Sequence, residues 1–138
     1  MNQNKNFVLI TDKIADYDLL LKEIPHPDRM IVEVFSPRDY LRALQSGIKY
    51  PAYCVWSPSH LKIAKSFGFP IVTMDANIFF RSPDTIRMVQ ELHDSGVTIL
   101  LFWTAYPDRD RPEWLKKYLG HTVSKIYTDT WSPEGKPK

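Results

Sequence analysis

The chain has 138 residues, a length that allows one ordinary domain and excludes two of full size. Apolar residues make up 43% and charged residues 25%, which favours a packed core and excludes intrinsic disorder. The net charge of +2 gives no basis for a nucleic-acid partner, and no apolar run is long enough for a membrane span. A single cysteine, Cys54, excludes an internal disulfide. Because residues 1–6 do not lead into a secretory signal, we expect a soluble, cytoplasmic protein.

Short apolar runs alternate along the chain with segments of helical periodicity. In one such segment Tyr40, Leu44 and Ile48 recur at helical spacing, and residues 17–24 are also predicted to form a helix. Short strand–helix–strand units require parallel strands joined by right-handed crossovers. The predicted strands are residues 7–11, 30–35, 52–56, 71–74, 97–103 and 123–128.

The predicted helices have recognisable ends. Ser-Pro pairs at 36–37, 57–58 and 82–83 each follow a strand, with serine suited to the N-cap and proline to the first helical position. Glycines stand where the helices are expected to end, at positions that favour a left-handed C-cap. These glycines are Gly47, Gly68, Gly96 and Gly120.

The pattern predicts a single α/β domain over residues 1–138, structured from 7 to 129 and followed by a tail at 130–138. Six parallel β/α units fit a partial α/β barrel. An open doubly wound parallel sheet fits as well, because both architectures bury the two faces of every strand.

In parallel α/β folds, ligands bind at the carboxyl ends of the strands, and this rule selects the candidate catalytic residues. Asp12 and Lys13 place a carboxylate beside an ammonium, which could hold a divalent cation and a phosphate oxygen; the alternative is a strand-end ion pair. Glu33 lies within an otherwise apolar strand, so its carboxylate must be paired, protonated or directed into a polar lumen. We favour the functional interpretation of Glu33 over a structural pair with Lys13.

Other side chains at strand ends are weaker candidates. Trp56 and Trp103 could stack on a substrate, although large aromatic residues are more often part of the core. Asp75 and Asp129 close strands and fit N-cap or turn positions more often than catalytic ones. His60 starts a helix near this edge and is expected to be solvated. No histidine pair has metal-ligand spacing, so no metal ligand is assigned.

Four segments carry a resemblance to a known family: 9–13 (LITDK), 31–37 (IVEVFSP), 101–104 (LFWT) and 125–129 (KIYTD). Over residues 7–129 the chain resembles the C-terminal portion of the glycerophosphodiester phosphodiesterase-like barrels of the phospholipase C-like phosphodiesterase superfamily. The resemblance implies a TIM barrel of lipid metabolism that hydrolyses phosphodiesters with a divalent cation, calcium or magnesium. On this alignment the chain supplies strands three to eight.

The resemblance also assigns roles to individual positions. Lys13 corresponds to the family's phosphate-facing lysine, whereas Thr11 stands where the family has a metal-binding glutamate. Trp103 corresponds to a substrate-lining aromatic residue, and Asp129 lies on the closing strand. The family's catalytic histidines and two of its metal carboxylates belong to the first two strands, which this alignment leaves outside the chain.

Three functions follow as expectations. The chain could be part of a metal-dependent phosphodiester hydrolase, inactive alone and completed by a missing N-terminal part or a second chain. It could instead be a degenerate, non-catalytic module for binding or oligomerisation, forming a homodimer through open sheet edges. A third alternative is a doubly wound domain with another chemistry at Asp12, Lys13 and Glu33.

Overall fold

A computed structural model describes residues 9–11, 14, 16–102, 117, 118 and 120–126. The chain divides into two compact units, Met1–Cys54 and Val55–Lys138. The division falls near the end of a strand, so the last residue of that strand belongs to the second unit.

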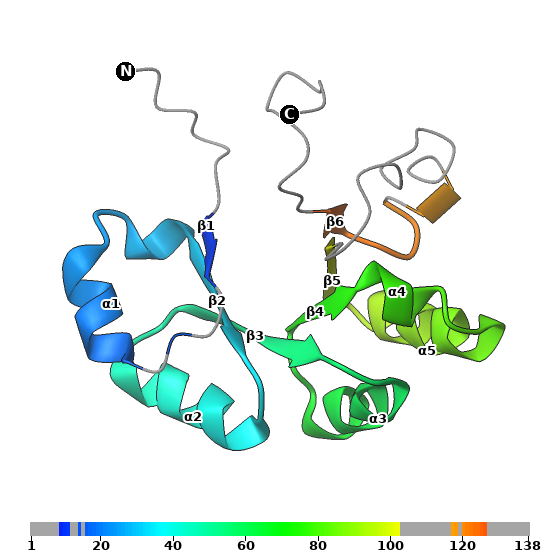
Figure 1. The fold of residues 1–138 in the computed structure, drawn as a ribbon, viewed down its shortest axis with the longest axis horizontal. Helices are drawn as coiled ribbons and strands as arrows, with labels where there is room; N and C mark the ends of the chain where they lie inside the picture. Colours follow the sequence, from blue (N-terminus) through cyan, green and yellow to red (C-terminus); the bar gives the residue numbers. More distant parts are fainter. Residues whose placement is uncertain (1–8, 12–13, 15, 103–116, 119, 127–138) are drawn as a thin grey trace. The chain divides into compact units, whose positions relative to one another are not determined.

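The first unit is built from parallel strands that lie in chain order. Strand β1 pairs with β2, and β2 pairs with β3 (Figure 1). In this ladder Thr11 lies beside Val32, and Glu33 lies beside Ala52. The elements are β1 (Leu9–Thr11), α1 (Tyr17–Glu23), a 3-10 turn (Pro27–Arg29), β2 (Met30–Val34), α2 (Pro37–Ser46) and β3 (Tyr50–Val55).

Buried side chains join the helices of this unit to one another and to its core. Tyr40 of α2 is buried, as is Tyr53 of β3, and burial raises the pKa of both phenols. Tyr17 of α1 is also buried, and the Arg42 guanidinium of α2 lies 5.8 Å from its ring centroid. The pKa of Tyr17 is raised mainly by burial and further by the Asp39 carboxylate, with Arg42 acting in the opposite direction. Helix α1 is therefore held against α2 by an aromatic side chain with charged neighbours.

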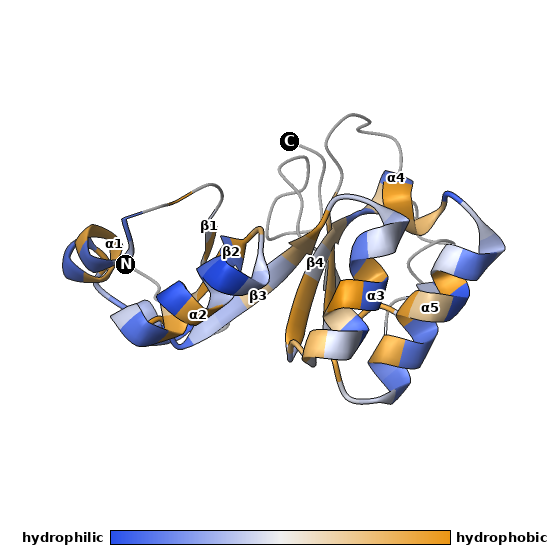
Figure 2. Cartoon of the chain, turned by 90° about the horizontal axis from the view of Figure 1, so that it is seen from below, coloured by the Kyte–Doolittle hydropathy of each residue, from blue (hydrophilic) through white to orange (hydrophobic). Residues whose placement is uncertain are grey.

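The second unit repeats the same construction. Strand β4 pairs in parallel with β5, and β5 pairs in parallel with β6. Its strands are predominantly hydrophobic, whereas α3 and α5 carry both hydrophobic and hydrophilic residues (Figure 2). Each helix therefore has apolar residues to bury and polar residues for solvent. The elements are α3 (Pro58–Phe67), β4 (Ile71–Asp75), α4 (Ala76–Phe79), α5 (Pro83–Asp94), β5 (Thr98–Phe102) and β6 (Lys125–Ile126).

Most predicted helix ends are confirmed. The Ser36 hydroxyl accepts a hydrogen bond from the Asp39 N–H at 3.1 Å, and the Ser82 hydroxyl accepts one from the Thr85 N–H at 3.2 Å. All four predicted glycines have positive φ, including the C-caps of α2 and α3. Ser57 differs: it occupies the N-cap position of α3, but its hydroxyl lies 2.7 Å from the Ser59 hydroxyl and makes no cap hydrogen bond.

The comparison with the predicted elements confirms an α/β fold with parallel strands. The short helix α4 was missed, because Ala76–Phe79 is only four residues long and shows no helical periodicity, and it follows β4 without a break. Within each unit the described strands follow chain order, without the reversal that marks the switch point of a doubly wound sheet. The predicted helix that should end at Gly120 lies largely outside the described residues, and the tail at 130–138 lies wholly outside them.

The contrast between two serines of the second unit gives a test of local stability. Replacing Ser82 by Ala removes a real N-cap and should cost about 1 kcal/mol, or about 3 °C in Tm. Ser57→Ala is the matched control and should cost only a few tenths of that, because no cap hydrogen bond is lost. Urea and thermal unfolding would measure both. Equal losses would show that Ser57 caps its helix in solution.

Candidate functional site

The structure describes two of the six predicted site residues. Glu33 lies on β2 and Trp56 directly follows β3. The others, Asp12, Lys13, Trp103 and Asp129, lie outside the described residues. The described part of the candidate site therefore consists of residues on and near the strand ends of each unit.

In the first unit, register separates two positions that the sequence analysis singled out. Side chains of paired residues in a parallel ladder point to the same side of the sheet, and successive residues alternate. Thr11 therefore shares a side with Val32, and Glu33 lies on the opposite side. The Thr11 hydroxyl is buried and has no hydrogen-bond partner in the described part of the chain. Thr11 and Glu33 consequently cannot face the same ligand from one surface of this sheet.

Glu33 is buried, with only 5% of its surface exposed. Its neighbours Val32 and Val34 are fully buried, so the carboxylate sits in a mostly apolar strand, as the sequence analysis expected. A buried carboxylate of this kind requires partners for its charge, and Glu33 does not lack one. Its burial is therefore compatible with a structural role as well as with a catalytic one.

At the end of β3, in the second unit, Trp56 and His60 form a local pair. Trp56 is 45% exposed, so the alternative that it belongs to the core is wrong. Its backbone N–H donates to His60 Nδ1 at 3.2 Å. Because Nδ1 accepts this bond, the neutral imidazole carries its proton on Nε2. His60 was expected to be merely solvated; the structure shows that the first turn of α3 fixes its ring through a backbone contact.

The end of β4 places a hydroxyl and a carboxylate on one side of the second sheet. Thr73 and Asp75 are two residues apart, and their ladder partners Leu100 and Phe102 share that side. Asp75 accepts the Asn77 N–H at 2.8 Å and so caps α4, which confirms its predicted N-cap role. Thr73 is fully buried, and its hydroxyl lacks a hydrogen-bond partner in the described residues. Sequence reasoning missed Thr73, although a threonine within an apolar strand was the available signal.

The described residues do not contain a complete cation site. Among them, no group of three or more His, Cys, Asp or Glu side chains is arranged to hold a metal ion. The calcium or magnesium implied by the family resemblance therefore does not fit the described part of the chain by itself. Cys54 is a free, buried thiol. A separate observation concerns membranes: within the described ranges, no helix has both the length and the apolarity needed for a span.

Comparisons with known proteins support the fold resemblance. No protein-family model matches the chain, and no curated protein matches it. Among solved structures, it is similar to a glycerophosphodiester phosphodiesterase from Parabacteroides distasonis ATCC 8503, with 18% sequence identity and a TM-score of 0.55. The match covers 91% of this chain and 54% of that one, so this chain spans about half of that protein's length. At this identity the similarity shows the fold, and it confirms the resemblance predicted from the sequence.

The buried Thr73 hydroxyl leads to a stability prediction. Thr73→Val removes a polar group without a protein partner while keeping the side-chain shape, so stability should stay the same or rise by about 1 kcal/mol. The matched control is Thr85→Val, which removes a buried hydroxyl 3.0 Å from the Ser82 hydroxyl and should cost about 1 kcal/mol. Chemical denaturation would measure both. A clear loss in Thr73→Val would show that its hydroxyl binds a water molecule or a ligand.

Proposed function

We propose that this chain is the C-terminal part of a glycerophosphodiester phosphodiesterase-like barrel and supplies strands three to eight. On this proposal it is inactive alone, and an N-terminal part or a second chain completes a metal-dependent phosphodiester hydrolase. The main support for this proposal is the fold match, which covers almost the whole of this chain but only about half of the similar enzyme. Consecutive parallel strands within each unit agree with successive strands of a barrel.

The proposed inactivity rests on the missing carboxylates. A divalent cation such as calcium or magnesium is held mainly by charged oxygen ligands. At the position where the family resemblance places a metal-binding glutamate, this chain has Thr11, whose buried hydroxyl supplies no negative charge. The remaining metal ligands and the acid–base histidines would then come from the completing part.

Lys13 is the residue that we propose to contact the substrate phosphate. Its ammonium would neutralise a phosphate oxygen and orient the ester. In the sequence, Lys13 lies two residues beyond Thr11, the position where the family resemblance places a metal ligand. Glu33 lies on the other side of this sheet from Thr11. We therefore place Lys13 ahead of Glu33 as the phosphate-binding candidate.

The other predicted site residues take supporting roles in the proposal. Asp12 would join Lys13 only where a local bulge turns it to the same side. Trp103, Trp56 and Asp129 would line the alcohol portion of a phosphodiester. The exposed indole of Trp56 is compatible with stacking against a ligand.

The second candidate is a degenerate module that binds or oligomerises without catalysis. Thr11 favours it, because a lost metal ligand is the expected mark of a barrel that no longer hydrolyses its substrate. Such a module could form a homodimer by pairing open sheet edges between copies. Light scattering distinguishes this dimer from a monomer. A partner chain that restores hydrolysis would exclude the degenerate module.

Lys13 provides the direct test of the proposed phosphate site. We expect Lys13→Ala to weaken binding of sn-glycerol 3-phosphate at least tenfold, or about 1.4 kcal/mol, because an ammonium–phosphate contact is lost. Its unfolding free energy should stay within about 0.5 kcal/mol of the unmodified chain. Calorimetric titration would give the affinity, and thermal unfolding would give the stability.

Lys49→Ala is the matched control, because Lys49 is an exposed lysine that lies over the Tyr50 ring, 5.2 Å from its centroid. Its affinity for the phosphate ester should remain unchanged. Parallel losses of stability and binding in Lys13→Ala would make Lys13 a structural residue and contradict its proposed role.

A further inference from the structure

Helices α3 and α5 of the second unit enclose a groove of about 380 Å³. Its deepest residues are apolar: Leu61 of α3 and Leu92 of α5 are both buried. Cationic side chains from both helices stand at its rim. The groove is lined by Leu61, Lys62, Lys65, Ser66, Arg87, Met88, Glu91 and Leu92.

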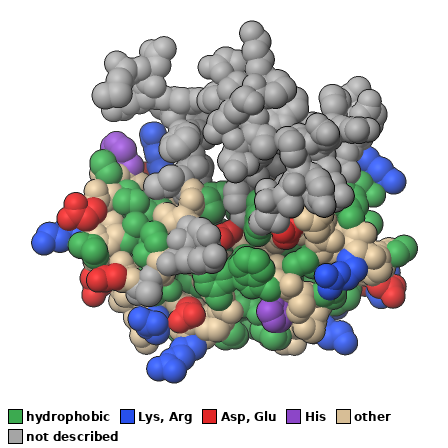
Figure 3. Space-filling view, viewed as in Figure 1, with side chains coloured by type: hydrophobic (Ala, Val, Ile, Leu, Met, Phe, Trp, Pro, Cys, Tyr) green, Lys and Arg blue, Asp and Glu red, His purple; other side chains and the backbone are tan. Residues whose placement is uncertain are grey.

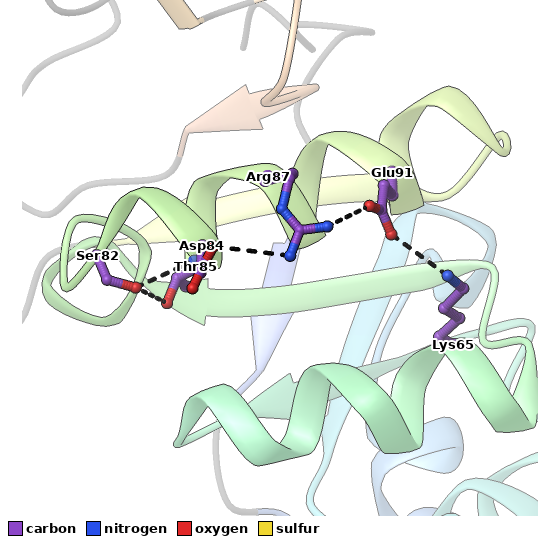
Figure 4. A network of polar contacts seen from close by, with 6 residues as sticks. All are labelled: Lys65, Ser82, Asp84, Thr85, Arg87 and Glu91. Atoms are coloured by element: carbon purple, nitrogen blue, oxygen red, sulfur yellow. Dashed lines mark hydrogen bonds and ion pairs between the residues drawn. The ribbon is translucent and has the colours of Figure 1, made fainter.

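An ion-pair network holds the rim together and leaves it positive. Glu91 lies between two cations, 3.3 Å from Lys65 and 2.9 Å from Arg87 (Figure 4). Arg87 also lies 3.6 Å from Asp84, outside the lining. Lys62 has no ion pair in the described part of the chain. With three cationic lining residues and one anionic lining residue, the groove carries a formal charge of +2.

Exposed apolar side chains continue the groove along α3. A shallower hollow of about 360 Å³ shares Lys62 and Ser66 with it and is also lined by Ile63 and Phe67. These two side chains are 40% and 43% exposed. Apolar residues next to Lys62 and the positive rim are suited to an occupant that presents an apolar side chain beside carboxylates.

Helix α1 of the first unit presents such a surface. Leu19 is 55% exposed, and Glu23, one turn further on, is also exposed. Asp16, one turn before Leu19, is exposed on the same face, whereas Asp18 and Lys22, also one turn apart, share another face of the helix. The acidic face of α1, defined as Asp16, Leu19 and Glu23, therefore has two carboxylates, a formal charge of −2.

We propose that the acidic face of α1 in one copy of this chain docks into the α3–α5 groove of a second copy. Leu19 would enter the apolar floor, and the two carboxylates of this face would lie against Lys62 and Lys65. Opposite formal charges of similar size and an exposed leucine facing an apolar groove support this occupant. The proposal is independent of the phosphodiester function and of the edge-strand dimer.

The two surfaces are different, so the contact is heterologous and generates short chains or rings rather than an isologous dimer. A single short helix in a groove makes a small interface, which is expected to be weak and salt-sensitive. On the face seen in Figure 3, acidic and basic side chains are interspersed with apolar ones over its described part. Because the two docking surfaces are separate, a charge substitution changes only one of them at a time.

The test is a charge exchange between two variants of the full chain. Glu23→Lys and Lys62→Glu should each weaken self-association at least tenfold, because like charges then face each other at the contact. An equal mixture of the two variants should associate again, since every contact between copies that alternate along a chain pairs opposite charges. Sedimentation velocity over about a hundredfold concentration range would measure this, at about 50 mM and about 500 mM salt.

Lys49→Glu is the matched control, because it makes the same charge change on an exposed lysine outside the groove and should associate like the unmodified chain. Thermal unfolding of each variant checks that the substitutions leave the fold intact. Failure of the mixture to associate would overturn the proposal. Association that depends neither on salt nor on either substitution would also overturn it, because it indicates edge pairing. So would an unmodified chain that stays monomeric and binds acidic peptides in the groove.

Discussion

Register between parallel strands decides which side chains of this chain can act on the same ligand. Pairing fixes the alignment, and the two-residue alternation of a strand then assigns each side chain to one side of its sheet. In the first unit this constraint separates Thr11 from Glu33. In the second unit it brings Thr73 and Asp75 to one side.

The same constraint limits what the buried carboxylate can do. Glu33 looked like a lumen residue because a charged group inside an apolar strand is costly without a purpose. Its burial is confirmed, but its side of the sheet is not that of Thr11, where the family resemblance places a metal ligand. A structural carboxylate, stabilised by its partners, therefore explains the burial of Glu33 as well as a catalytic carboxylate does.

Local sequence signals predicted most of the elements because they act over a few residues. Ser36 and Ser82 cap helices as expected, and Gly47 and Gly68 end them in the left-handed conformation. Ser57 has the same Ser-Pro pattern, but its hydroxyl contacts Ser59 instead, a choice that residue type alone does not encode. The single-turn helix α4 was not predicted, because four residues are too few to show a helical period.

The candidate site was less predictable than the fold. The exposure of Trp56 and the backbone contact of His60 depend on where β3 ends relative to the first turn of α3. Hydrophobic periodicity and composition do not specify that position. The fold resemblance was recognisable from the order of short strand-end segments, and the match to a solved phosphodiesterase confirms it at 18% identity.

The most direct test of the account uses the unmodified chain, with product binding and substrate turnover measured on the same sample. We predict saturable binding of sn-glycerol 3-phosphate together with no hydrolysis of glycerophosphodiesters above the uncatalysed rate, with calcium or magnesium present. Metal-dependent hydrolysis by the isolated chain would contradict the proposed incompleteness. Absence of phosphate-ester binding would contradict the proposed phosphate site.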